Sequence, residues 1–134
     1  MLQAIREAVD RGLIDQIEDA AHFETLTSLL DRARVLARDG LTPAAGAVGL
    51  TVIHEHLREC CVRSACLPSG APSPDDLATQ LFRRGHLSEQ QRSLVRSTCE
   101  VGMNCQEARN SDGSEEEVLA MLDDVSKFIA AHAV

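Results

Sequence analysis

The sequence predicts an all-α protein, a compact bundle of five to six helices, and three observations favour this fold class. Apolar residues recur at spacings of three and four, and no run alternates between apolar and polar residues as strands do. Signals for helix starts and ends recur along the chain. With 134 residues, of which 44% are hydrophobic, the chain can bury one core, so we expect a single domain over residues 1–134.

The first 40 residues predict two helices. Leu2, Ile5 and Val9 lie at helical spacing, and Gly12 predicts the end of this first helix. A second helix follows from Leu13 to about residue 37. The pattern leaves open whether this second helix is one rod or breaks near residue 22.

The third predicted helix has signals at both ends. Gly40 can close the helix before it, and Thr42 followed by Pro43 predicts an N-cap with proline at the first helical position. We expect this helix to run to about Arg63. On a helical wheel one stripe faces the core or its edge, and it holds Leu50, His54, Leu57 and Cys61.

Three further helices complete the predicted bundle. After a loop over residues 65–72, Ser73 and Pro74 open a short helix that Gly85 stops, and Ser88 with Gln91 forms a capping box for the next. That helix carries Leu94, Val101, Cys105 and Ala108 on one stripe and ends in a polar turn at 110–113. The last helix has an apolar face formed by Val118, Leu122, Val125 and Ile129, and His132 continues the same spacing.

Composition excludes several classes of partner. The formal net charge of −8 disfavours binding to duplex DNA, which requires lysine and arginine at the phosphates. Aromatic residues make up 2% of the chain, too few for base stacking along single strands. Five cysteines without CxxC spacing, no leader segment and no long apolar run predict a cytoplasmic protein without a membrane partner.

Each reactive side chain of the third helix can have either a structural role or a functional one. His54 fits a hydrogen-bonded packing residue, a proton carrier or contact, or a metal ligand. His56 and Cys60 lie four apart and can reach one ion, but a zinc site needs three or four ligands, so we predict no metal. Cys60 beside His56 is the one local pair for thiol chemistry, which needs a thiolate. Arg58 and Glu55 fit a surface ion pair.

Several segments occur in an order that is typical of one superfamily. They are Leu30, Ala33 and Leu36 before Gly40, then Pro43-Ala44-Ala45, IHEHLR at 53–58, LATQL at 77–81 before Gly85, and VLAMLDDVSKFI at 118–129. Over about residues 12–129 the chain resembles the HEPN-like (higher eukaryotes and prokaryotes nucleotide-binding) helical domains of bacteria, especially a branch with an L-E-E-H-L-R helix. His54 departs from that branch, which has an acid there.

The resemblance implies an RNase motif that this chain has lost. Catalytic members are similar to metal-independent RNases, in which the Arg and His of an R-N-x-x-x-H motif, often brought together by dimerisation, act on RNA. Here Met103 stands in place of the Arg and Ala108 in place of the His, and Asn104 alone matches. A shifted copy starting at Arg109 meets Ser114 where the His is needed. Without an imidazole, no group near pKa 7 can move the proton of the 2′-hydroxyl.

We therefore expect a non-catalytic HEPN-like interaction or dimerisation module, RNA-associated or in a stress or antiphage system, that forms a homodimer. One alternative is a residual or altered RNase-type enzyme, which requires two of His54, His56 and Cys60 within hydrogen-bond reach and a perturbed pKa. Another is an antitoxin-like acidic module for a basic protein. We expect no cofactor and no catalytic residue, and the candidate binding residues are His54, His56, Arg58, Asn104 and Arg109.

Overall fold

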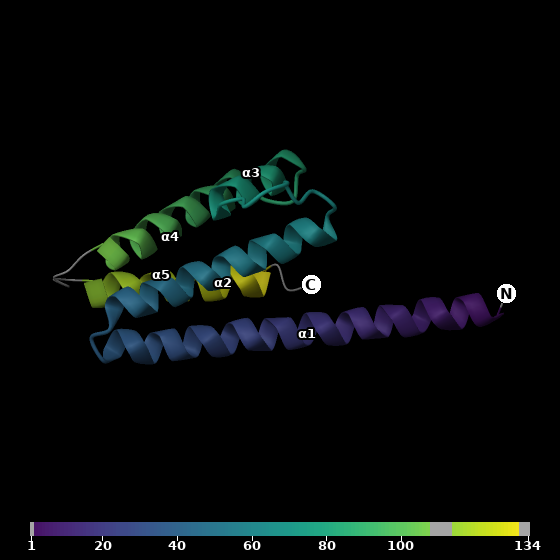
Figure 1. Cartoon of the computed structure of the whole chain (residues 1–134), viewed down its shortest axis with the longest axis horizontal. Helices are drawn as coiled ribbons and strands as arrows, with labels where there is room; N and C mark the ends of the chain where they lie inside the picture. Colours follow the sequence, from purple (N-terminus) through teal and green to yellow (C-terminus); the bar gives the residue numbers. More distant parts are fainter. Residues whose placement is uncertain (1, 108–113, 132–134) are drawn as a thin grey trace.

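The computed structural model describes residues 2–107 and 114–131, which form five helices and no strand (Figure 1). In chain order these are α1 (Leu2–Arg38), α2 (Thr42–Arg63), α3 (Pro74–Arg83), α4 (Glu89–Glu107) and α5 (Ser114–Ala131). The all-α class and the helical bundle are confirmed. Within the described ranges, no helix has the combination of length and apolar character that a membrane crossing requires.

Helix α1 is longer than the sequence pattern predicts. The expected end at Gly12 is wrong, because α1 continues through this glycine and through residue 22 without a break. One glycine inside a helix costs only about 1 kcal/mol relative to alanine. No proline accompanies it, so the flanking helix formers carry the helix across.

Helices α1, α2 and α3 end in the same hydrogen-bond pattern, the Schellman motif. After α3, Gly85 has φ +78°, its N–H donates to the Phe82 carbonyl at 3.0 Å, and the next N–H donates to the Leu81 carbonyl at 2.8 Å. Gly40 closes α1 in the same way with φ +84°. The predicted glycine stops at residues 40 and 85 are therefore confirmed.

The starts of the helices follow the predicted caps at two places and differ at one. Ser73 caps α3 in a full capping box with Asp76, and the box of Ser88 and Gln91 precedes α4. Thr42, however, does not act as the N-cap of α2. It is the first helical residue and is buried, while Leu41 occupies the cap. Helix boundaries inferred from sequence commonly shift by one residue in this way.

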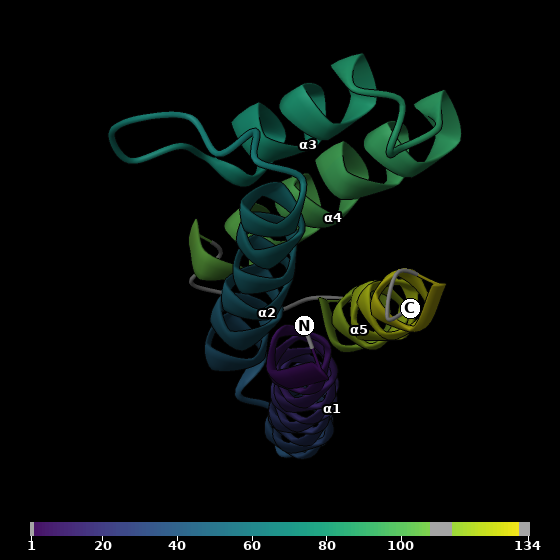
Figure 2. The same cartoon turned by 90° about the vertical axis from the view of Figure 1, so that its right-hand side faces the viewer.

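Helix α2 is the central helix of the bundle. It contacts all four other helices. Figure 2 shows α1 on one side of α2, α3 and α4 on the opposite side, and α5 alongside α1 and α2. The core is continuous across these contacts and contains Leu26, Leu30, Ala33, Val52, Ile53, Leu57, Leu77, Leu81, Val95, Val118, Leu122, Val125 and Ile129. The predicted apolar face of α5 is confirmed from Val118 to Ile129, and His132 lies outside the described residues.

At two glycines, side chains of neighbouring helices occupy the space that a Cβ atom would need. A Cβ placed on Gly102 of α4 would lie 2.5 Å from Cγ of Leu50 on α2, and one on Gly49 of α2 would lie 2.6 Å from Cε of Met121 on α5. The buried line of α4 therefore runs through Val95, Thr98 and Gly102. The predicted α4 stripe is shifted: Leu94 and Val101 are half-buried at its edge, and Ala108 lies outside the described residues.

Candidate functional site

His54 holds the loop between α2 and α3. Its Nε2 lies 3.1 Å from the carbonyl oxygen of Pro72, and its side chain is half-buried. This hydrogen bond joins the middle of α2 to the residue just before the Ser73 cap. The geometry fits the hydrogen-bonded packing interpretation of His54.

His56 occupies the core, which the sequence pattern did not predict. It is 4% exposed, and its ring meets that of Phe128 on α5 edge-on, with 5.6 Å between ring centroids and an interplanar angle of 86°. His56 is not on the predicted core-facing stripe of the helical wheel. Because α2 contacts four other helices, positions away from that stripe are also covered.

The His56–Cys60 pair has both features expected of an altered enzyme, two side chains within hydrogen-bond reach and a shifted pKa, but the direction of the shift does not suit a nucleophile. Cys60 Sγ lies 3.6 Å from His56 Nε2, within reach of a weak thiol hydrogen bond. However, burial raises the pKa of the Cys60 thiol, an effect that the Arg63 charge only partly offsets. A catalytic cysteine needs a lowered pKa so that the thiolate is present near neutral pH. The shift therefore has the wrong direction for a nucleophile.

The thiol next to Cys60 is even less acidic. Burial, followed by a hydrogen bond with the Cys66 side chain, raises the pKa of Cys61 to about 12. The Cys61 thiol also donates to the Leu77 carbonyl oxygen at 3.6 Å. These contacts belong to the packing of α2 against α3. Among the residues described, no three His, Cys, Asp or Glu side chains are grouped so as to hold a metal ion.

The remaining candidate residues lie apart from the two histidines. Arg58 is exposed on α2, with its guanidinium 3.7 Å from the Glu55 carboxylate, as the surface-pair interpretation predicts. Asn104 is exposed near the end of α4, beside exposed Met103. Arg109 lies outside the described residues. The structure therefore does not gather the five candidate residues into one site.

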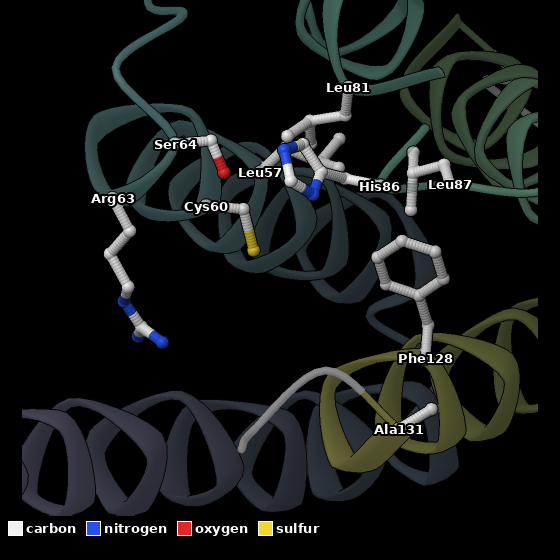
Figure 3. Close-up of a pocket in the computed structure, with 9 residues that line it drawn as sticks. All are labelled: Leu57, Cys60, Arg63, Ser64, Leu81, His86, Leu87, Phe128 and Ala131. Atoms are coloured by element: carbon white, nitrogen blue, oxygen red, sulfur yellow. The ribbon is translucent and has the colours of Figure 1, made fainter. Parts of the chain in front are cut away.

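A cavity of about 310 Å³ lies where the last turns of α2 and α5 approach the end of α3 and the turn that follows it (Figure 3). Figure 3 shows Cys60 and Arg63 of α2 and the next residue, Ser64, on one side, Leu87 and Phe128 on the other, and the His86 ring between them. Of these residues, the sequence analysis weighed only Cys60 as a candidate for chemistry. With Leu81 of α3, the lining residues come from four separate segments, whose meeting depends on the packing of the helices.

The first half of α1 is the second distinctive feature. Figure 1 shows α1 continuing well past the ends of α2 and α5. Gly12, Leu13, Glu18, Ala20 and Ala21, whose side-chain environments are described, are all exposed. A Cβ placed on Gly12 would meet no atom within 4 Å. This part of the helix therefore projects into solvent.

The geometry provides a central helix whose histidines serve packing, a small cavity at one end of the bundle, and a projecting helix. Among the described candidate residues, the structure brings only His56 and Cys60 within hydrogen-bond reach of each other. Comparison of the chain with protein-family models, with curated proteins and with solved structures finds no match.

Proposed function

We propose that this chain is a non-catalytic helical interaction module that pairs with a second copy through the first half of α1. The observation that carries the proposal is the projection of this half-helix beyond the bundle (Figure 1). An isolated helix of this length is only marginally stable in water, and helices in proteins are stabilised mainly by packing of an apolar face. We therefore expect the projecting half of α1 to pack against a partner.

The sequence of the projection provides an apolar face that is separate from the core. Apolar residues recur at positions 2, 5, 9, 13, 17 and 20. In the second half of α1 the buried positions are 26, 30, 33 and 37. At 100° per residue, the two sets are rotated by roughly a third of a turn about the helix axis. The first set therefore does not continue the face that packs inside the chain.

The charges of the projection support a second copy as the partner. Its first part is neutral, with Arg6 and Arg11 balanced by Glu7 and Asp10, whereas its second part is acidic and has no basic residue. Antiparallel pairing of two such helices places the neutral part of one copy beside the acidic part of the other and keeps the two acidic parts apart. Gly12 lies between the two parts and allows close approach of the backbones.

Two matched substitutions test the pairing. Leu13 and Val35 are exposed apolar residues of α1, at 56% and 55% exposure, one on the projection and one beside the bundle. By sedimentation equilibrium, the unaltered chain should have twice the mass of the 14.5 kDa monomer. Leu13→Glu should shift it to the monomer, and Val35→Glu should leave the dimer intact. A monomeric unaltered chain, or equal dissociation by both variants, contradicts the proposal.

The resemblance to HEPN-like domains supports a module without RNase chemistry, since Met103 stands in place of the arginine of the motif. Incubation with single-stranded RNA in the presence of a chelator should yield no cleavage products. Cleavage that Asn104→Ala abolishes would instead support the altered-enzyme alternative. Tight binding to a cationic protein by a chain that stays monomeric would support the antitoxin-like alternative.

A further inference from the structure

We propose that the cavity at the shared end of α2, α3 and α5 binds a small monocarboxylic acid with an apolar chain. The cavity has a volume of about 310 Å³, at the lower end of the range of small-molecule sites. None of the described residues in the projecting half of α1 is among those that line it. The proposal therefore goes beyond self-association and can fail or succeed separately from it.

The inner wall of the cavity suits an apolar chain. It is formed by Leu57 from α2, Leu81 from α3, Leu87 from the turn before α4, and Phe128 from α5, all of which are buried. A chain that fills this space would lose apolar surface to a wall already assembled from four segments. Each buried methylene group then contributes about 0.8 kcal/mol.

The outer wall suits a single negative charge. Arg63, Ser64 and His86 line it together with Cys60, and among the described residues that line it there is no Asp or Glu. The Arg63 guanidinium Nε lies 3.7 Å from the Glu59 carboxylate, an ion pair that restrains the arginine at the rim. The planar guanidinium matches the two oxygens of a carboxylate. The Ser64 hydroxyl and the His86 imidazole, which line the same cavity, offer further polar groups.

The thiol in the outer wall does not oppose an anion. Burial raises the pKa of Cys60, so that the sulfur carries its proton at neutral pH and has no negative charge. An S–H group is also a weak hydrogen-bond donor. Cys60 therefore adds a neutral, polarisable contact at the boundary between the apolar wall and the polar rim.

The C-terminal ends of the surrounding helices bear on the charge that a ligand would meet at the cavity rim. Helices α2, α3 and α5 all finish near the cavity, and the C-terminal end of a helix carries a partial negative charge. At α2 and α3, however, the last-turn carbonyls already accept hydrogen bonds from the N–H groups of residues 64–66 and 84–86. Among the described lining residues, Arg63, which also pairs with Glu59, is therefore the side chain with a permanent positive charge that a bound head group would meet.

A titration followed by amide NMR tests this assignment, with octanoate as the probe and octanol and octylamine as comparators. Octanoate should shift the resonances of the cavity residues in a saturable way, with an affinity at least about tenfold above that of octanol, because one charge-assisted hydrogen bond contributes that much. Preference for octylamine, equal affinity for octanol, or shifts confined to other surfaces would overturn the proposal.

Two variants assign the binding to the cavity. Arg63→Gln should weaken octanoate binding by about tenfold. Arg58→Gln, on the same helix and also paired with a glutamate, should leave the affinity unchanged. Ala131→Trp, at an exposed lining position, should fill the cavity and remove binding of both octanoate and octanol. Unchanged octanoate affinity in Arg63→Gln, with the native amide spectrum retained, would contradict the carboxylate assignment.

Discussion

Ala65 ends α2 at the position where the ends of α1 and α3 have a glycine. It closes α2 with a φ of +53°, in the left-handed region where glycine is favoured. The hydrogen bonds are those of the ends of α1 and α3, since its N–H donates to the Val62 carbonyl and the Cys66 N–H to the Cys61 carbonyl. At residues 40 and 85 the equivalent position is glycine. The end of α2 therefore carries a local strain that the other two ends avoid.

Replacing Ala65 by glycine should stabilise the protein. The left-handed conformation costs a residue with a Cβ about 1–2 kcal/mol, and the added freedom of glycine in the unfolded chain offsets part of that gain. We expect Ala65→Gly to raise the free energy of unfolding by about 0.5–1 kcal/mol, measured by urea denaturation. The matched control Gly85→Ala should lower it. A loss of stability in Ala65→Gly would show that the backbone is not strained there.

The buried thiols predict a loss of stability in alkali. Burial, followed by the charge of Asp75, raises the pKa of Cys99 from 9.0 to about 11. Between these pH values the unfolded chain gives up the proton while the folded chain keeps it, so stability falls as the pH rises. Urea denaturation near pH 8 and near pH 10.5 should show a smaller fall for Cys99→Ala than for the unaltered chain. Equal falls would contradict the shift.

At the scale of the elements, the crossing of α2 and α4 depends on Gly102. Leu50 of α2 fills the space that a side chain at this position would need. The crossing of α2 and α5 at Gly49 differs, because the closest atom there is the end of the flexible Met121 side chain. The first contact therefore tolerates an added methyl group less well than the second.

Alanine substitutions at three glycines should rank in a definite order. We expect Gly102→Ala to destabilise the protein by about 1–3 kcal/mol through overpacking. Gly49→Ala should cost less, and Gly12→Ala, in open space, should stabilise α1 by up to about 1 kcal/mol. Thermal unfolding of the three variants measures the order. The double variant Gly102→Ala with Leu50→Ala should recover part of the loss at Gly102 by relieving the overlap.

Four predicted helix ends are confirmed, although the predicted end at Gly12 and the predicted cap at Thr42 are wrong. Stops at Gly40 and Gly85 and caps at Ser73 and Ser88 depend on a few neighbouring residues, so the local sequence suffices. The burial of His56 and the line of α4 through Gly102 depend on which helices lie alongside. A helical wheel has one core-facing direction, whereas α2 is covered from several sides.

At the scale of the whole molecule, the projecting half of α1 should be dispensable for the fold. The buried residues of α1 start at Leu26 among the positions whose side-chain environment is described. Deletion of residues 1–17 should therefore leave the far-UV signal of a helical bundle and a cooperative unfolding transition, while the dimer mass is lost. Circular dichroism and sedimentation measure the two properties. Loss of the cooperative transition would show that the projection belongs to the core.

The cavity shows why a site can be absent from a sequence pattern. Arg63, Ser64, His86 and Phe128 have no common spacing, and each has an ordinary structural role at a helix end or in the core. They form a wall only because three helices finish at the same end of the bundle. The sequence pattern drew attention to His54, His56 and Cys60 within α2, and in the structure these side chains take part mainly in packing.

The position of α5 has a consequence for synthesis of the chain on the ribosome. Arg34 of α1 bonds to Asp123 of α5 at 3.3 Å, across 89 positions of sequence, and α5 also contacts α2 and α4. Leu122, Val125 and Ile129 therefore reach the core only after the other four helices have been translated. Until then, α1 and α2 expose apolar surface that α5 later covers, and the nascent chain depends on rapid docking of its last helix to avoid aggregation.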